Sequence, residues 1–195
     1  MELNRTIFVS VDIETTGLGK NAKIVEIGAY KFKPFGLGIE MFDELIHPGI
    51  EIPQDVISIH GITDEMVEHK PEIEKVMPMF LDFIAGHALI AHNARFDFSF
   101  LSRTALLCGV EIQDSHVFDT LAISRKAFPG IKHNLIQLSN FLGLKPDGDR
   151  HRGLSDAKLA AGVFELCMDK LNINTYAKLR KRFRPRYPMS FLGKQ

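Results

Sequence analysis

The chain reads TIFVSVDIE over residues 6–14. Its side chains alternate between apolar residues on one side and mostly polar residues on the other, which is the pattern of a β-strand. The apolar side carries Ile7, Val9, Val11 and Ile13, and the other side carries Thr6, Phe8, Ser10, Asp12 and Glu14. We expect the strand to end where Gly17 and Gly19 follow.

Two acids lie on the same side of this predicted strand. Asp12 and Glu14 are two residues apart, which places them roughly 6.6 Å apart along the strand. Like charges at that spacing repel each other, and apolar flanks add the cost of lost hydration. The acids are therefore expected either to be solvated at the strand's end or to share a cation. On their own, the two acids favour the solvated reading.

Two further strands are predicted directly after the first. Residues 24–32 and 39–46 have strand-like patterns, and the turn-rich stretch KPFGLG separates them at residues 33–38. Spacers this short favour hairpins, so we expect the three strands to pair antiparallel.

The rest of the sequence alternates between helical and strand patterns. After Pro71, apolar residues recur at three- and four-residue steps until Gly86, as in an amphipathic helix. Helices are also predicted over residues 96–107, 121–128, 135–142 and 155–171, and strands over 88–91 and near 116–118. The expected fold class is α/β, with a mixed central β-sheet flanked by α-helices.

Composition restricts the class of protein. The 195 residues are 45% hydrophobic and 25% charged, which is the profile of one globular domain with a sizeable core. Cys108 and Cys167 are too few for a disulfide framework and do not form a C-x-x-C pair. The N-terminus lacks a secretion signal and no stretch approaches membrane-spanning length. We therefore expect a cytoplasmic protein without a membrane partner.

The net charge of zero hides an asymmetry. Residues 174–195 contain seven basic residues and no acid, so the tail is +7 and residues 1–173 are −7. A segregated basic tail can hold phosphates electrostatically. A solvated or frayed terminus explains the same composition equally well.

Two more acids stand at the starts of predicted helices. Asp156 falls on the apolar stripe of the last helix, together with Ala160 and Val163, so its carboxylate needs a partner. Alternatively, Ser155 or Asp156 caps the helix N-terminus. Asp97 lies in the first turn of an earlier helix, where aspartate is also ordinary.

The four carboxylates together indicate a metal site more strongly than any of them does alone. Acids at strand ends and helix starts of an α/β sheet can converge at one edge. Hard oxygen ligands of this kind suit Mg²⁺ or Mn²⁺ rather than zinc. Two such ions about 3.5–4 Å apart form the clamp used for in-line phosphoryl displacement.

Three motifs resemble those of the DEDD superfamily of 3′→5′ exonucleases, in the branch whose last motif carries a histidine. They are VDIETTGL at residues 11–18, HNARFD at 92–97 and HRGLSDA at 151–157. Linking stretches are similar to the proofreading epsilon subunits of bacterial DNA polymerase III, namely IVEIGA at 24–29, IHGIT at 59–63, DTLA at 119–122 and FPG at 128–130. The resemblance implies a ribonuclease H-like fold.

The resemblance also implies residue roles. It makes Asp12, Glu14 and Asp156 direct ligands of two Mg²⁺ or Mn²⁺ ions, with Asp12 bridging them. It makes Asp97 a ligand chiefly through water, and His151 the general base. The positions that line the terminal-nucleotide pocket are Thr15, Thr16, Leu18, His60, Asn93 and Phe96. Core packing is the alternative for Leu18 and Phe96, and fixing a loop is the alternative for His60.

The implied activity is that of a 3′→5′ exodeoxyribonuclease, a two-metal-ion phosphodiester hydrolase. It would release nucleoside 5′-monophosphates from the 3′ end of single-stranded DNA, in proofreading or DNA repair. Residues 1–173 would form the exonuclease domain and 174–195 a basic C-terminal tail. The motifs leave open whether the chain acts alone or as a polymerase subunit, and in which oligomeric state.

Two other functions compete with this one. An exoribonuclease that trims RNA ends or short oligonucleotides is the first, because the motifs do not separate DNA from RNA. A module that binds nucleic acid or a polymerase without catalysis is the second. The presence of all four acids and the histidine argues against the second.

Overall fold

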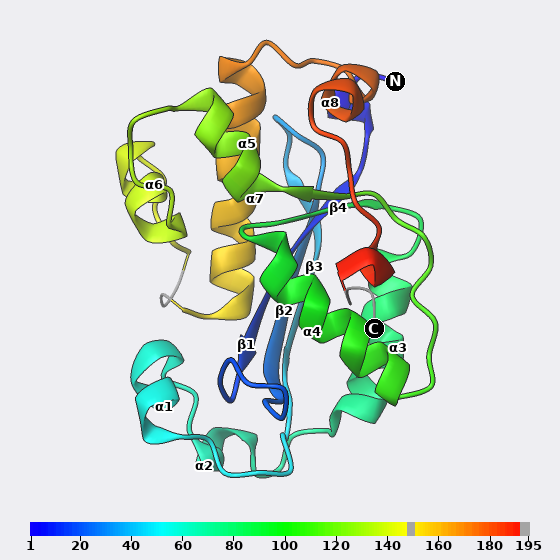
Figure 1. Cartoon of the computed structure of the whole chain (residues 1–195), viewed down its shortest axis with the longest axis vertical. Helices are drawn as coiled ribbons and strands as arrows, with labels where there is room; N and C mark the ends of the chain where they lie inside the picture. The colour runs from blue at the N-terminus through cyan, green and yellow to red at the C-terminus, as the bar shows by residue number, and fades with distance from the viewer. Residues whose placement is uncertain (148–150, 192–195) are drawn as a thin grey trace.

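The computed structural model describes residues 1–147 and 151–191 of the chain. Over these residues, five strands form one sheet in the order β3-β2-β1-β4-β5 (Figure 1). They are β1 Phe8–Thr15, β2 Ile24–Phe32, β3 Gly38–Leu45, β4 Ala88–Ala91 and β5 Val117–Asp119. β1, β2 and β3 pair antiparallel, whereas β4 and β5 run parallel to β1. The predicted α/β class with a mixed sheet is confirmed.

Strand β1 is the middle strand and is covered on both faces. Phe8 and Ser10 are as fully buried as Val9 and Val11 on the opposite side, because helices cover both faces of the sheet. Exposure begins only near the C-terminal end of the strand, where Asp12 and Glu14 are partly buried. The acids therefore lie where the central strand leaves the core.

Helices form a layer on each face of the sheet (Figure 1). α3 and α4 pack on one face and share a hydrophobic cluster with β1. α5, α6, α7 and α8 pack on the other face, around Phe8 and Phe164. Their bounds, with those of the two remaining helices, are α1 Gln54–His60, α2 Asp64–Val67, α3 Ile73–Ile84, α4 Ala94–Leu107, α5 Thr120–Ala127, α6 Leu135–Phe141, α7 Gly153–Lys170 and α8 Tyr176–Arg182.

Several helix boundaries differ from the sequence predictions. The most consequential is α7, which begins at Gly153 with Arg152 at the N-cap position. Neither Ser155 nor Asp156 caps this helix, so the capping alternative is wrong. α1, α2 and α8, and the 3₁₀ helices Leu3–Arg5 and Pro188–Phe191, were not predicted. These elements have seven residues or fewer and so offer at most two turns of helical periodicity, although α6, of the same length as α1 and α8, was predicted.

Helix α7 lies close against β2 because two glycines face each other. A Cβ added at Gly28 of β2 would overlap the backbone of Gly153 and Leu154. A Cβ added at Gly153 would in turn crowd the backbone of Gly28 and the carbonyl oxygen of Asp12. This close approach brings the first turn of α7, which contains Asp156, to the acidic end of β1.

The basic C-terminal segment is folded onto the domain as far as residue 191. The backbone N–H of Tyr176 donates to Met1 O at 3.1 Å, and Val117 and Arg186 exchange two backbone hydrogen bonds. Leu179 and Phe191 are buried. A frayed terminus is therefore the wrong reading for residues 174–191, and residues 192–195 lie outside the described part. The division of the chain at residue 173 stays a prediction. Among the described residues, no helix is both long and apolar enough to cross a bilayer.

Candidate active site

All four predicted carboxylates line one cleft of about 540 Å³. Asp12 and Glu14 come from the end of β1, Asp97 from the first turn of α4, and Asp156 from the first turn of α7. β1 and β4 are parallel, so their C-terminal ends meet at one edge of the sheet, and α4 starts shortly after β4. His151, Asn93 and Phe96 line the same cleft. The fold thus assembles three sequence motifs that are far apart along the chain.

Burial raises the pKa values of three of the carboxylates, and repulsion between the acids adds to this at Asp12 and Glu14. Burial, followed by the charges of Asp97 and Glu14, raises the pKa of Asp12 well above its usual range. Burial and the charge of Asp156 raise the pKa of Glu14 to about 8. Burial raises the pKa of Asp97 to about 7, although its carboxylate accepts a hydrogen bond from the N–H of Ile13 at 3.2 Å. So much crowded negative charge calls for a cation.

The donor atoms fit a divalent metal. One ligand atom each from Glu14, His151 and Asp156 lie within 4.8 Å of one another, and Asp12 and Asp97 line the same cleft. Carboxylate oxygens are the ligands that Mg²⁺ and Mn²⁺ prefer. The cluster can therefore hold such ions, with the imidazole of His151 beside them.

The raised pKa values give a first testable prediction, on stability. Between about pH 7 and pH 8.5, the folded chain without metal holds protons on Asp97 and Glu14 that the unfolded chain has already lost, so its stability should fall as pH rises. Mg²⁺ binds the deprotonated cluster and should remove this fall. Thermal unfolding in EDTA and in Mg²⁺ across this range measures both effects.

The Asp97→Asn variant is the control for this prediction, because it removes one of the titrating groups and should flatten the EDTA profile. Buried histidines such as His60 and His92, whose pKa values burial lowers, give the opposite slope. That rise in stability is centred near the unfolded pKa of about 6.5 and is nearly finished by about pH 7.5, so the upper part of the window reports the carboxylates. An EDTA profile that rises across the window would contradict the cluster's raised pKa values.

Glu26 on β2 fixes the segment that connects His151 to α7. Its carboxylate is buried and accepts hydrogen bonds from Arg152 Nε at 2.9 Å, Arg152 Nη2 at 2.7 Å and Gly153 N at 2.6 Å. Glu26 pairs across the sheet with Glu14. Consequently, one buried acid sets the position of the residues that lie between His151 and Asp156.

Sequence reasoning missed this role of Glu26. The only signal was an acid inside the otherwise apolar run IVEIGA, a placement that requires a charged or hydrogen-bonding partner. The partner could not be identified from the sequence because Arg152 is 126 residues away.

His92 is a second residue whose structural role the sequence did not reveal, and it lines the cleft. Its Nε2 donates to the carbonyl of His133 at 2.7 Å, and its Nδ1 lies 3.0 Å from Thr120 Oγ1. Burial lowers the pKa of His92, which favours the neutral ring. The contacts tie the start of α4 to the segment before α6, and Asn134 and the first turn of α6 line the cleft.

The predicted nucleotide-pocket residues are only partly brought together. Asn93 and Phe96 line the cleft, whereas Thr15, Thr16, Leu18 and His60 are not among its lining residues. Phe96 also packs against Phe100, with ring centroids 5.1 Å apart and the rings tilted by 50°. Leu18 is 85% exposed, so core packing is wrong for this residue. The roles of all six residues in binding a nucleotide stay predictions.

The remaining residues of that set shape the loops beside the cleft. Thr15 Oγ1 donates to Gly17 O at 2.7 Å, and Thr16 Oγ1 accepts from Lys23 N at 3.0 Å. Both bonds lie within the β1–β2 connection that carries Leu18. Buried His60 accepts from Ile62 N at 3.0 Å through Nδ1, which is a loop-fixing contact.

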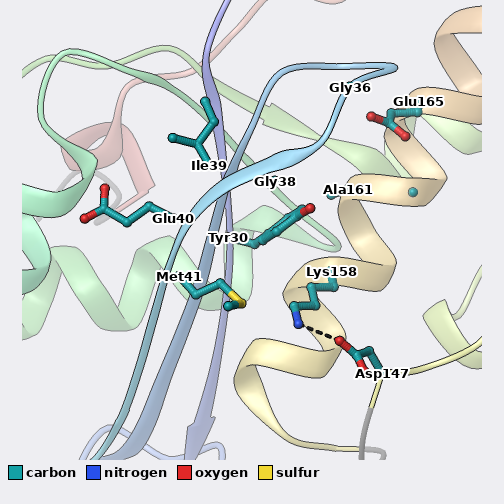
Figure 2. Close-up of a pocket in the computed structure, with 11 residues that line it drawn as sticks. Tyr30, Gly36, Gly38, Ile39, Glu40, Met41, Asp147, Lys158, Ala161 and Glu165 are labelled. Atoms are coloured by element: carbon teal, nitrogen blue, oxygen red, sulfur yellow. Dashed lines mark hydrogen bonds and ion pairs between the residues drawn. The ribbon is translucent and has the colours of Figure 1, made fainter.

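A second hollow, of about 440 Å³, lies between β3 and α7 (Figure 2). Tyr30, Met41 and Lys158 line it, whereas the four clustered carboxylates line the cleft. Lys158 Nζ lies 2.6 Å from a carboxylate oxygen of Asp147. Because Asp147 precedes His151 by four residues, this pair anchors the chain shortly before His151, as Glu26 does directly after it.

Comparisons with known proteins show which family the chain matches. The exonuclease family profile, RNase_T, matches residues 9–164. The chain is 38% identical over 161 residues to a DNA polymerase III subunit epsilon of Treponema pallidum, covering 80% of this chain and 74% of that protein. It is 39% identical over 166 residues to a PolC-type DNA polymerase III of Caldanaerobacter subterraneus subsp. tengcongensis, covering 84% of this chain. It spans only 12% of that polymerase's length.

The fold is also that of a solved exonuclease. The structure of exonuclease X in complex with 5′ overhanging duplex DNA is 27% identical to this chain, with a TM-score of 0.68. The match covers 86% of this chain and 93% of that one. The predicted ribonuclease H-like fold and the predicted resemblance are both confirmed, and the chain belongs to the exonuclease family, as a 3′-exonuclease of the DEDD type.

Proposed function

We propose that the chain is a metal-dependent 3′→5′ exodeoxyribonuclease that releases nucleoside 5′-monophosphates from single-stranded DNA ends. The observation that carries this proposal is the convergence of Asp12, Glu14, Asp97 and Asp156 with His151 in one cleft. Crowded acids with raised pKa values are costly to the fold, and holding cations for phosphoryl chemistry accounts for that cost.

The residues divide the work as follows. Asp12, Glu14 and Asp156 would hold two Mg²⁺ or Mn²⁺ ions, and Asp97 would contribute chiefly through water. When bound, such ions supply charge stabilisation at the scissile phosphate and lower the pKa of the attacking water. His151 accepts the proton of that water as its oxygen bonds to phosphorus and the bond to the 3′-oxygen of the next nucleotide breaks.

The terminal nucleotide is held by residues beside the acids. Phe96 lies in the cleft wall and partly in the core, which gives it the rigidity needed to stack on a base. Asn93 has a left-handed backbone, φ 69°, and its N–H donates to Asp119 Oδ1 at 3.1 Å. This bond fixes the start of α4 beside the nucleotide. Stacking and phosphate contacts read no base edges, so sequence preference should be weak.

DNA is favoured over RNA because the two relatives described above are a PolC-type DNA polymerase III and a DNA polymerase III subunit epsilon. The second prediction follows: purified protein with Mg²⁺ should shorten single-stranded DNA from its 3′ end faster than RNA of the same sequence. Mass spectrometry should detect nucleoside 5′-monophosphates as the products. Faster cleavage of RNA would overturn the choice of DNA and support the exoribonuclease alternative.

The proposed setting is proofreading or DNA repair, either alone or beside a polymerase. A primer with a mismatched 3′ end frays more readily than a paired one and should be shortened faster. Equal rates on paired and mismatched ends would contradict a proofreading role while leaving the exonuclease assignment intact.

A further inference from the structure

The described part of the C-terminal segment carries an unusual concentration of positive charge. Its six basic side chains, which we call the basic surface, are all exposed: Lys178, Arg180, Lys181, Arg182, Arg184 and Arg186. Residues 174–191 contain no acid. Over residues 1–147 and 151–191, none of the six is in an ion pair with a carboxylate. Their charges are therefore available to an external anion.

The fold holds these charges in a fixed place. Leu179, on the inner side of α8, is buried. At the start of the helix, Thr175 Oγ1 accepts a hydrogen bond from Lys178 N at 3.3 Å. Arg186 is bonded through its backbone to Val117, and its guanidinium lies 4.0 Å from the ring centroid of Phe191. The basic surface is therefore part of the domain's exterior rather than a loose tail.

The basic surface begins close to the cleft and leads away from it. Val117, bonded to Arg186, starts strand β5, and Asp119 at the end of that strand holds the N–H of Asn93 in the cleft wall. Two residues of strand span roughly 7 Å. From Arg186 the segment continues to α8, which lies beside the N-terminus at the top of Figure 1, away from the end of β1.

We propose that the basic surface binds the phosphate backbone of the substrate strand several nucleotides upstream of its 3′ end. This inference rests on the proposed function, because it takes nucleic acid as the substrate. At roughly 3.4 Å per nucleotide, a strand whose end lies in the cleft reaches Arg186 after about two nucleotides and α8 only after several more. The contacts therefore select for length and not for the terminal nucleotide.

The chemistry of the surface favours nucleic acid over a protein partner. Protein interfaces have an apolar centre and are depleted in lysine, whereas nucleic-acid interfaces are polar and strongly positive. On α8 the buried apolar residue Leu179 points into the domain, and the exposed side chains are mainly cationic. A polyanionic strand matches this surface without leaving buried charge unpaired.

The experiment compares two charge-matched triple variants. One replaces Lys178, Arg180 and Lys181 by Gln, and the control replaces the exposed Lys33, Lys70 and Lys75 by Gln. Exonuclease kinetics are measured on a DNA trinucleotide and on a strand of about 30 nucleotides at several salt concentrations, and binding of the long strand is measured by fluorescence anisotropy. Circular dichroism checks that both variants are folded.

The basic-surface variant should show a rise of at least about tenfold in the KM for the long strand, and its salt slope should fall by about 2, since each phosphate contact on a single strand contributes about 0.7. Its kcat/KM on the trinucleotide should match the unmodified protein. The control should change neither. An unchanged salt slope, or an equal loss on both substrates, would overturn the proposal. Absence of DNA cleavage by the unmodified protein would count against the proposed function instead, and the anisotropy measurement would still decide the binding proposal.

Discussion

Replacing Asp12 by Asn should lower exonuclease activity by roughly 10⁴-fold or more, the scale seen when a central catalytic group is removed. Asp12 stands at the centre of the acidic cluster, and the charges of Asp97, Glu14 and Asp156 all act on it. A neutral amide at this place cannot balance the charge of divalent ions. Asp156→Asn, which acts from the facing helix, should have a loss of the same order.

The same substitution should stabilise the metal-free protein. Removing one of several mutually repelling carboxylates relieves the repulsion that raises their pKa values. Asp12→Asn should therefore unfold at a higher temperature in EDTA, while the stabilisation that Mg²⁺ provides is lost. A variant that is more stable and yet inactive separates loss of metal binding from loss of folding.

The matched control is Asp169→Asn. Asp169 is exposed near the other end of the same helix as Asp156, so this change removes a carboxylate from α7 without touching the cleft. Its activity and its response to Mg²⁺ should equal those of the unmodified protein. Titration calorimetry measures metal binding in each variant. If Asp12→Asn retained both cleavage and normal Mg²⁺ binding, the assignment of the acids as metal ligands would be wrong.

The elements that sequence predicted well are those with strong local patterns. The run at residues 24–32 matches β2 in both bounds, and 88–91 matches β4. Asp12, Glu14 and Asp156 could be named because a carboxylate in an apolar context is anomalous, whereas Asp97, which is ordinary at a helix start, was named only in combination with them. That they share one cleft depends on β1 and β4 being parallel neighbours, a non-local pairing that no local pattern specifies.

Other features depended on contacts that only the folded chain makes. The start of α7 was placed two residues too late because its N-cap residue, Arg152, is not a type that favours capping. Arg152 is instead held in place by Glu26. Likewise, the order of the C-terminal segment comes from backbone bonds to Met1 and Val117, residues that are remote in sequence.

Replacing His151 by Gln should slow cleavage by about 10²–10⁴-fold, the usual contribution of a positioned general base. His151 has a left-handed backbone, φ 55°, and one of its ring nitrogens lies within 4.8 Å of carboxylate oxygens of Glu14 and Asp156. Glutamine keeps a polar side chain of similar reach but cannot accept a proton near neutral pH. Binding of Mg²⁺ and of a single strand should therefore remain close to normal while single-turnover cleavage falls.

The competing reading of His151 is that it only braces the turn into α7, and Glu26→Gln distinguishes the two readings. Glu26 holds Arg152 and Gly153 but does not line the cleft. Glu26→Gln therefore weakens these contacts and leaves the chemical nature of the His151 imidazole unchanged. Glu26→Gln should lower the unfolding temperature and reduce both Mg²⁺ binding and cleavage, because a buried ion pair loses its charge and the first turn of α7 shifts.

His151→Gln should instead leave the unfolding temperature and Mg²⁺ binding nearly unchanged while single-turnover cleavage falls, because only the group that accepts the proton is absent. A His151→Gln variant that resembles Glu26→Gln in stability and metal binding would assign His151 to the brace. Near-normal cleavage in His151→Gln would remove the histidine from the chemistry altogether, and the proton of the attacking water would then have to leave by another route.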